Sequence, residues 1–429
     1  VMYHDFADGS HHLFHTLNAN GKRIALNFES SPTTGLLSGT PAQVSGVLLD
    51  DSMAVESGDK VLKLASGGGV DGGSNGGTPA PLPNTLGEQS TLVILVNFQD
   101  APTDQPWTPG EVDTAFFGEV NDFFFENSFG HSPLVGDVYG WFTIPSSSSA
   151  CDQRQIEVEA RSAAVAAGVD LAAYMHQVYV FPQNSNCLFS GTSTVGGNPS
   201  RAWINGDLRL KILGHELGHS LGLSHAHSIA CEGSTLGDNC TEVEYGDGVD
   251  IMGASPEAHF TAFNKERLGW LNNGALPPIT IVENSGIYSL EPYALSSSGT
   301  KALKVYKGLD SFTGKGVWYY IEYRQPIGFD SVFTSFTKSL MYSDNLFNGV
   351  VIHTGSPEQS GNTSYLLDMT PETYHLYTRD PALEVGRSYS DQEAGVTITP
   401  LWADTTGAAV DISFGTQSCV PNVPGLSIT

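Results

Sequence analysis

The chain has 429 residues, 40% of them hydrophobic, which is enough for packed cores in roughly two or three domains. Its 46 acidic and 19 basic residues give a formal net charge of -27, which argues against nucleic acids and anionic membrane surfaces as partners. Unbroken apolar runs such as residues 92–96 are far shorter than the roughly 18 residues of a membrane-spanning helix. We therefore expect a globular protein without a membrane span.

Residues 1–65 alternate short β-type runs with turns rich in Gly, Pro and Ser, a pattern that predicts a small β-rich N-terminal domain. The runs cover 23–28, 44–49 and 60–64. Four early histidines have no fixed ligand spacing, so we interpret them as surface residues rather than metal ligands: His4, His11, His12 and His15. The chain starts at Val1 without a basic and apolar leader, and we expect any signal peptide to have been removed or left out.

Residues 66–86 form a Gly- and Pro-rich stretch with almost nothing to bury, which predicts an exposed linker. A larger domain is expected over 87–275. It begins with the apolar run 91–98, which is typical of a central strand buried on both faces. A capping box at Thr108 then predicts a helix start. The elements expected next are a strand over 134–144, an Ala-rich helix over 152–167 and an apolar strand over 178–181.

Residues 214–225 read Gly-His-Glu-Leu-Gly-His-Ser-Leu-Gly-Leu-Ser-His. On an α-helix, His215 and His219 are four residues apart, so both imidazoles lie near one face and can reach one ion. Glu216 is turned away from the metal and can hold a water beside it, which is the general-base position of an HExxH motif. Gly222 can take a positive φ and end the helix, so that the chain folds back and His225 supplies a third nitrogen.

Three imidazoles would leave a zinc ion with one open coordination position, where a water has its pKa lowered to about 7. The competing interpretation is a His- and Glu-rich helix without a metal. It is disfavoured because five specified residues at this spacing rarely coincide by chance.

Residues 245–254 read Tyr-Gly-Asp-Gly-Val-Asp-Ile-Met-Gly-Ala and resemble the Met-turn of the metzincins, in which a methionine lies beneath three histidines. This points to Met252. The run from Glu244 to Met252, together with residues 259–271, resembles the gametolysin-type peptidases, which are secreted zinc endopeptidases of the metzincin clan. The resemblance is specific over about residues 87–275. It implies an α+β fold with a twisted mixed sheet and an active-site helix, one catalytic zinc and peptidase activity.

Ala254 stands two residues after the methionine, where some metzincins carry a tyrosine as an additional metal or transition-state ligand. A tyrosine switch at this position is therefore excluded. Residues 192–203 occupy the place of the metzincin edge strand, along which an extended peptide would bind by main-chain hydrogen bonds. An ordinary loop is an equally good interpretation of this segment.

The composition changes to short strands after residue 275, which predicts a β-sandwich over 276–418. Eight strands are expected, at 279–282, 286–290, 302–306, 317–323, 350–353, 364–367, 396–399 and 410–414. Glu322 and Arg324 stand two apart on one face of a strand and are expected to form a structural pair. Residues 419–429 look like the start of a further linker or domain, so we expect a truncated or processed chain.

The five cysteines form no CxxC pair, and histidines already supply the metal ligands, so disulfides are their expected use. Cys231 and Cys240 are close enough to staple the loop before the Met-turn. Cys151 with Cys187 is the remaining pairing in the same domain. Cys419 would then be the odd cysteine, with a free thiol.

The predicted function is that of a secreted, zinc-dependent endopeptidase in which Glu216 deprotonates a zinc-bound water for attack on the peptide carbonyl. One zinc is expected, whereas calcium is left open and not located. The expected partners are protein or peptide substrates of a monomeric enzyme. Two alternatives are a zinc hydrolase of a non-peptide amide and a catalytically silent zinc-containing adhesion protein, which would be expected to lack the glutamate.

Residues 1–85 are further expected to be a propeptide that is removed by cleavage in the Gly-rich linker. Because the first cysteine is Cys151, no thiolate from this segment can cap the zinc, and latency needs an oxygen or nitrogen ligand or steric cover. Asp71, between flanking glycines, could reach the metal, although a solvated linker aspartate is the favoured interpretation.

Overall fold

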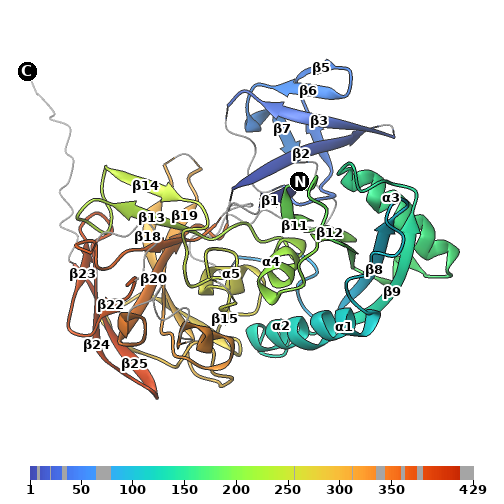
Figure 1. Ribbon diagram of the computed structural model, residues 1–429. Helices are drawn as coiled ribbons and strands as arrows, with labels where there is room; N and C mark the ends of the chain where they lie inside the picture. Colours follow the sequence, from blue (N-terminus) through green and yellow to red (C-terminus); the bar gives the residue numbers. More distant parts are fainter. Residues whose placement is uncertain are drawn as a thin grey trace, which may run out of the picture.

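The computed structural model describes residues 1–429 except 7–9, 20, 31–35, 64–78, 256, 312, 335–343, 359–362, 374–379 and 416–429. Asp71 and Cys419 lie outside the described residues, and so do the predictions made for them. The fold is a mixed α+β structure with many strands and few helices (Figure 1), which confirms the expected class at this level.

Four parallel strands form the core of the larger sheet: β9 (Leu134–Ile144), β8 (Gln89–Phe98), β10 (His176–Phe181) and β12 (Ser200–Asn205). Residues 92–96 in β8 are fully buried, as the continuous apolar run predicted, because helices cover both faces. Beyond β12 the sheet continues with β11 (Phe189–Thr194), which pairs antiparallel to β12. The segment 192–203 therefore contributes to two strands rather than to one loop.

Helices pack on both faces of this sheet. α3 (Gln153–Ala166) covers one face through Ile156, Ala160 and Ala164. The other face is covered by α1 (Pro109–Asp113), a π-helical stretch (Thr114–Val120), α2 (Asn121–Asn127) and α4 (Leu210–Ser220). Thr108 caps α1, since its hydroxyl accepts from the Glu111 N–H at 3.2 Å and its own N–H donates to the Glu111 carboxylate at 2.7 Å.

The N-terminal strands continue the same sheet instead of standing apart from it. β1 (Met2–Phe6) pairs antiparallel with β11, and Figure 1 shows the blue strands extending from this edge. The order beyond β1 is β2 (His11–Ala19), β3 (Lys22–Phe28), β6 (Ser52–Val55) and β5 (Val47–Leu49), which completes ten strands. A separate pair consists of β4 (Ala42–Val44) and β7 (Val61–Lys63), with a 3₁₀ turn at Gly58–Lys60.

The end of the expected linker is not exposed along its whole length. Thr85 is only 2% exposed, and its carbonyl accepts a hydrogen bond from the Trp270 indole at 2.9 Å. The Leu82 N–H donates to the carbonyl of Arg267 at 2.7 Å. The expectation that the linker is exposed up to residue 86 is therefore wrong at its C-terminal end. The backbone groups of this end form hydrogen bonds with residues in and just after α5.

The C-terminal strands form two further sheets that share one hydrophobic core. The nine-stranded sheet contains β13 (His227–Cys231), β14 (Cys240–Val243), β15 (Asn272–Asn273), β16 (Pro278–Val282), β18 (Ala302–Leu309), β19 (Gly316–Glu322), β20 (Gly349–Gly355), β21 (Tyr365–Leu367) and β22 (Leu383–Glu384). The four-stranded sheet contains β17 (Gly286–Leu290), β23 (Tyr389–Asp391), β24 (Val396–Asp404) and β25 (Gly407–Phe414). All eight strands expected after residue 275 are present.

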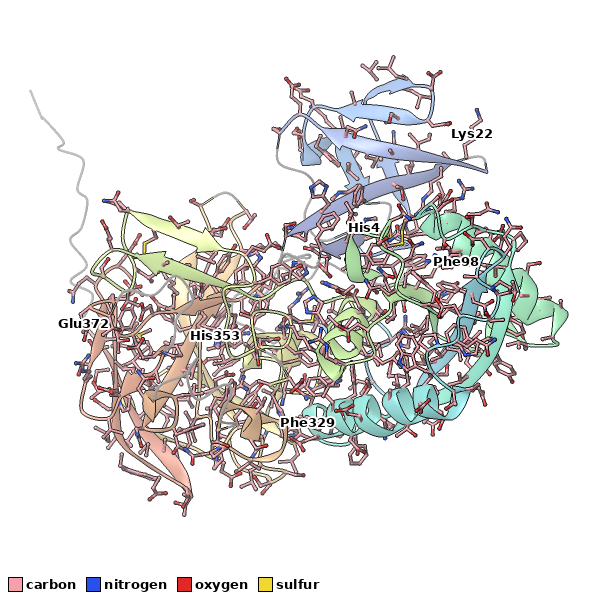
Figure 2. The ribbon with its side chains drawn as sticks, in the orientation of Figure 1. His4, Lys22, Phe98, Phe329, His353 and Glu372 are labelled. Carbon is pink, nitrogen blue, oxygen red and sulfur yellow. A yellow bond between two sulfur atoms is a disulfide. The ribbon has the colours of Figure 1, made fainter. Side chains whose placement is uncertain are left out.

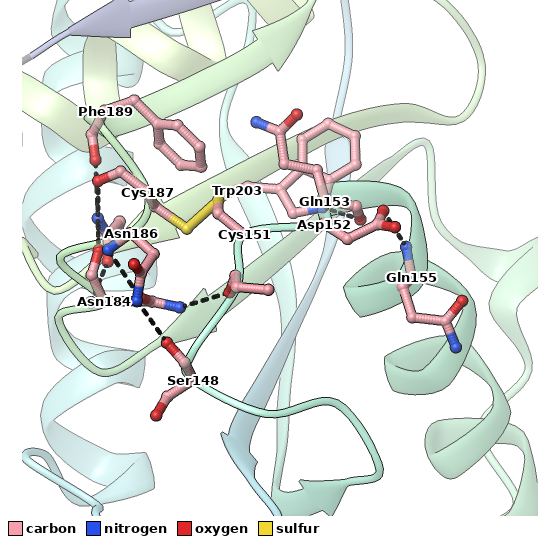
Figure 3. The surroundings of a disulfide bond; sticks show 12 residues. Ser148, Cys151, Asp152, Gln153, Gln155, Asn184, Asn186, Cys187, Phe189 and Trp203 are labelled. Carbon is pink, nitrogen blue, oxygen red and sulfur yellow. Dashed lines mark hydrogen bonds between the residues drawn. A yellow bond between two sulfur atoms is a disulfide. The ribbon is translucent and has the colours of Figure 1, made fainter.

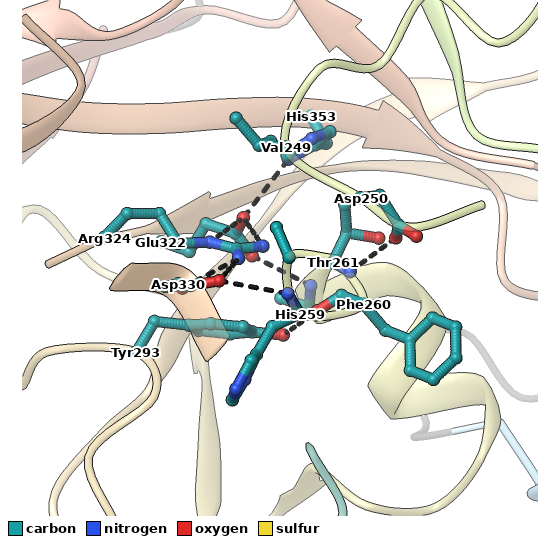
Figure 4. Close-up of polar contacts among 12 residues, drawn as sticks. Val249, Asp250, His259, Phe260, Thr261, Tyr293, Glu322, Arg324, Asp330 and His353 are labelled. Carbon is teal, nitrogen blue, oxygen red and sulfur yellow. Dashed lines mark hydrogen bonds and ion pairs between the residues drawn. The ribbon is translucent and has the colours of Figure 1, made fainter. Parts of the chain in front are cut away.

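A buried ionic cluster joins the C-terminal strands to the segment around α5 (Ala262–Arg267) (Figure 4). Arg324 donates to Glu322 Oε1 at 2.9 Å and to both Asp330 oxygens at 3.0 Å, which confirms the expected pair and adds a third member. The carboxylates also accept main-chain N–H groups: Asp330 from His259 at 3.0 Å and Glu322 from Ala262 at 2.8 Å. All four carboxylate oxygens of Glu322 and Asp330 therefore accept a hydrogen bond.

Among the described residues, no helix combines the length and the apolar character needed to cross a membrane. The short remaining 3₁₀ segments are Leu171–Ala173, Gly328–Thr334 and Asp344–Phe347.

Candidate metal centre

The end of α4 turns the chain back on itself. The Gly222 N–H donates to the carbonyl of His219 at 2.8 Å, and the Leu223 N–H donates to that of Gly218 at 3.1 Å. This pair of bonds is a Schellman motif. Gly222 has a φ of 100°, a conformation in which a Cβ would be strained. The helix therefore ends where the glycine predicted, and the following residues return over it.

Three imidazoles meet as a result. His219 Nε2 lies 3.0 Å from His225 Nε2, and the ring centroid of His215 lies 4.8 Å and 5.2 Å from those of the other two. Each Nδ1 has an oxygen partner: Ile251 O for His215 at 2.9 Å, Leu223 O for His219 at 2.8 Å and Glu244 Oε1 for His225 at 2.7 Å. Because an Nδ1–H donates to each of these oxygens, all three Nε2 lone pairs face one point.

This arrangement fits a bound metal ion. Facing lone pairs repel one another unless a cation lies between them, and His215 Nε2 is buried without a hydrogen-bond partner. Burial lowers the pKa of His215 to about 3, so this imidazole stays neutral and available as a ligand. The three histidines would hold the ion through their Nε2 atoms.

Glu216 lies buried next to the three histidines and reaches toward β11. A Cβ on Gly191 would lie 2.7 Å from the carboxyl carbon of Glu216, so only glycine leaves room for this side chain. Glu216 Oε2 has no hydrogen-bond partner. Burial, together with the negative charge of Asp5, raises the pKa of Glu216 well above its usual range. The arrangement can therefore accept a proton beside a metal ion.

Met252 is fully buried and packs against the side of α4 that carries Gly218. A Cβ on Gly218 would lie 2.5 Å from Met252 Sδ, so this glycine allows the methionine to pack tightly against the helix next to His219. The Met252 N–H donates to Asp250 Oδ1 at 2.7 Å, and its carbonyl accepts from the Ala226 N–H at 3.0 Å. The methionine segment is thereby tied to the residue that follows the third histidine.

Asp5 of β1 is the fourth side chain of the centre, and the sequence interpretation missed it. Its Oδ1 lies 2.9 Å from His225 Nε2, and its Oδ2 lies 3.4 Å from His215 Nε2 and 3.3 Å from His219 Nε2. The carboxylate thus stands at the point that the three Nε2 atoms face.

Residues 131–302, which include α4, His225 and Met252, match the family model described as Gametolysin peptidase M11. This match supports a gametolysin-type metallopeptidase. No curated protein matches the chain.

β1 brings Asp5 to the candidate metal centre along β11. Asp5 pairs in register with Gly191, and His4 with Thr192. His4, labelled in Figure 2, marks this junction, with its ring centroid 5.8 Å from that of Phe189. For this segment a peptide-binding edge strand and an ordinary loop were equally good interpretations, and the structure pairs its strand β11 with the chain's own N-terminal strand.

A second layer of the centre was also missed. Glu244 accepts from His225 Nδ1 and lies 3.1 Å from His11 Nε2. Tyr245 packs over His225 with ring centroids 4.0 Å apart, and its hydroxyl donates to Asp5 Oδ1. Glu244 and Tyr245 both belong to the run 244–252, whose resemblance to the gametolysin-type peptidases was the sequence signal that could have identified them. His11 here and His15, which is 6% exposed, correct the prediction that the early histidines are surface residues.

Two disulfides join the predicted pairs. Cys151 bonds to Cys187 beside Trp203 (Figure 3), and Cys231 bonds to Cys240 between β13 and β14. The second bridge lies just after His225, where the sequence placed it.

Proposed function

We propose that this gametolysin-type peptidase is a secreted endopeptidase with one catalytic zinc ion, held by His215, His219 and His225. The observation that carries the proposal is the convergence of three imidazole Nε2 atoms beside the buried carboxylate of Glu216. Three nitrogen ligands with one further position are typical of catalytic rather than structural zinc sites. Met252, packed under α4, fits a metzincin-like fold in which the methionine supports the histidines.

When bound, zinc would supply a Lewis acid that polarises the peptide carbonyl and acidifies water. Glu216 is the general base: it accepts the proton of the attacking water and then passes it to the leaving nitrogen. Its place against Gly191 keeps the carboxylate in one position beside β11. An extended protein substrate would lie along β11, where main-chain hydrogen bonds orient the scissile bond.

The proposal includes latency. Residues 1–65 would form a propeptide, in which β1 occupies the β11 edge and Asp5 takes the place of the water and the substrate carbonyl. This assigns to Asp5 the role of oxygen ligand, which the sequence interpretation considered for Asp71 but disfavoured. Activation would require cleavage in the stretch 66–86 and release of β1.

The remaining parts have supporting roles in this proposal. Residues 87–275 would be the catalytic domain, and 276–418 a β-sandwich that holds its third histidine in place. Two contacts support this role: Thr363 donates to the carbonyl of His225, and the His227 N–H donates to the carbonyl of Ser364 at 3.0 Å. Secretion is supported by the two disulfides, which persist in oxidising compartments.

The test is hydrolysis of casein by the zinc-loaded chain after cleavage within residues 66–78, with and without a zinc chelator. We expect activity that the chelator removes and added zinc restores. Glu216→Gln should keep zinc and lose at least about 10³-fold in kcat, because the base is gone. Glu157→Gln, on the remote helix α3, is the matched control and should keep full activity.

Two outcomes would favour the alternatives. Hydrolysis of simple amides without cleavage of casein would indicate a non-peptide amidase. Tight zinc binding with no hydrolysis of either substrate would indicate a silent binding protein. Activity of Glu216→Gln equal to that of the unchanged protein would contradict the assigned base.

A further inference from the structure

Tyr245 stands at the metal centre without being one of the metal-ligand candidates. Its ring centroid lies 4.0 Å from that of His225 and 6.0 Å from that of His215. Its hydroxyl donates a hydrogen bond to Asp5 Oδ1. Because the same oxygen lies 2.9 Å from His225 Nε2, the hydroxyl is one hydrogen bond away from the point that the histidines face.

The backbone holds Tyr245 in an unusual conformation. Its φ is 54°, a left-handed value that a residue with a bulky side chain rarely adopts and that concentrates at functional sites. The preceding residue, Glu244, accepts a hydrogen bond from His225 Nδ1 at 2.7 Å. Two consecutive residues therefore serve one site: a carboxylate orients the third histidine, and a hydroxyl faces the open side of the centre.

The Asp5 carboxylate indicates what this hydroxyl would meet during hydrolysis. When water adds to a peptide carbonyl, the carbon carries two oxygens, one from the water and one from the carbonyl. The carboxyl carbon of Asp5 also presents two oxygens to the centre, with Oδ2 facing His215 and His219 and Oδ1 facing Tyr245 and His225. The oxygen held by Tyr245 corresponds to the carbonyl oxygen.

We propose that Tyr245 is a catalytic residue whose hydroxyl donates a hydrogen bond to the substrate's carbonyl oxygen as that oxygen gains negative charge. This inference rests on the proposed peptidase function. The tyrosine keeps its proton throughout. The water oxygen bonds to the carbonyl carbon, its proton passes through Glu216 to the leaving nitrogen, and the C–N bond breaks. A donor aimed at the developing oxyanion stabilises the transition state more than the bound substrate.

The sequence alone argued against a tyrosine in this role after the methionine, because Ala254 stands there. Tyr245 comes seven residues before Met252 and reaches the centre from the other end of the same turn. Its hydroxyl first binds Asp5 in the uncut chain and becomes available to a substrate once β1 leaves.

The test compares Tyr245→Phe with the unchanged protein, both zinc-loaded and cut within residues 66–78. The variant keeps the ring over His225 and removes only the hydroxyl. We expect kcat on a peptide substrate to fall about 10²-fold with KM nearly unchanged, since a lost oxyanion donor has effects of this size. A phosphinic peptide, which carries a tetrahedral anion, should bind about 10²-fold more weakly, measured by calorimetry, while zinc content stays the same.

Tyr174→Phe is the matched control. Its hydroxyl makes the same kind of bond, to Asp137 Oδ2 at 2.6 Å, away from the histidines, so kcat and phosphinic-peptide affinity should not change. Unchanged kcat and affinity in Tyr245→Phe would overturn the inference, and so would a loss that accompanies loss of zinc. If the unchanged protein binds the phosphinic peptide but cleaves no peptide, the proposed function fails, whereas the affinity comparison still decides the role of Tyr245.

Discussion

Glu244 shows how a single residue can orient a proposed metal ligand without itself being one of the proposed ligands. Its Oε1 accepts from His225 Nδ1 at 2.7 Å, which fixes the tautomer that leaves Nε2 free. Burial opposes ionisation of Glu244, but the bonds from His225 and His227 outweigh it and hold its pKa well below the usual range. The carboxylate therefore stays charged at all working pH values.

Replacing Glu244 by Gln should weaken zinc binding about 10- to 100-fold, because the neutral amide orients the ring less strongly and lowers its basicity. Competition with a chromophoric chelator measures this affinity. The matched control is Glu242→Gln, an exposed position on the adjacent strand β14, which should bind zinc like the unchanged protein. Equal affinities of the two variants would show that Glu244 has no orienting role.

Residues of the centre that lie close in sequence could be predicted, and those that lie far apart could not. The helical spacing of His215 and His219 and the turn at Gly222 are local consequences of backbone geometry. Asp5 reaches the same point from more than 200 residues away, through the β1–β11 pairing. No local pattern encodes that pairing, so the sequence offered only the glycine-flanked Asp71 as a possible capping oxygen, and a solvated linker aspartate was the favoured interpretation of that residue.

Among the elements, β1 is the strand that we propose closes the site. It pairs with β11 over Met2–Phe6, which places Asp5 opposite Gly191 and next to Glu216. In this proposal, pairing of β1 with β11 would by itself hinder substrate binding, and the Asp5 carboxylate would in addition compete with the substrate for the metal. The two contributions can be separated by changing the side chain and leaving the strand.

In the uncut, zinc-loaded chain, Asp5→Ala should allow cleavage of a short peptide that the unchanged chain does not cleave, because the carboxylate no longer occupies the centre. The measurement is the initial rate, with intact mass confirming that the chain is uncut. Asp59→Ala, an exposed position in the same N-terminal region, should stay inactive. If Asp5→Ala is as inactive as this control although cut protein is active, the strand alone causes latency.

The helices and strands themselves were largely predictable from apolar runs, capping residues and turns. The eight strands predicted after residue 275 are examples. Their association was not predictable. β13 and β14, which precede residue 275 in the chain, belong to the C-terminal sheet through the parallel pairing of β13 with β21. Non-local pairing of this kind depends on the whole fold rather than on the strand sequence.

For the whole molecule, the buried cluster of Arg324, Glu322 and Asp330 links the C-terminal sheets to the peptidase segment. All three side chains are fully buried. Removing the cation would leave two carboxylates without their partner in the interior, which is far more costly than losing an exposed pair.

Arg324→Ala should therefore lower the free energy of unfolding by about 3 to 5 kcal/mol, measured by denaturant titration. Arg387→Ala, which breaks an exposed pair with Glu372 at 2.8 Å, should lower it far less, because solvent screens an exposed ion pair. Similar losses in the two variants would mean that the cluster does not join the two parts energetically.

The zinc content of the purified full-length chain tests the proposed metal centre directly, measured by elemental analysis for the unchanged protein and for His225→Ala. We predict one zinc per chain in the unchanged protein and its loss in the variant, because removal of the third nitrogen leaves two imidazoles to hold the ion. A chain that binds no zinc, or a His225→Ala variant that still binds one equivalent tightly, would contradict the account.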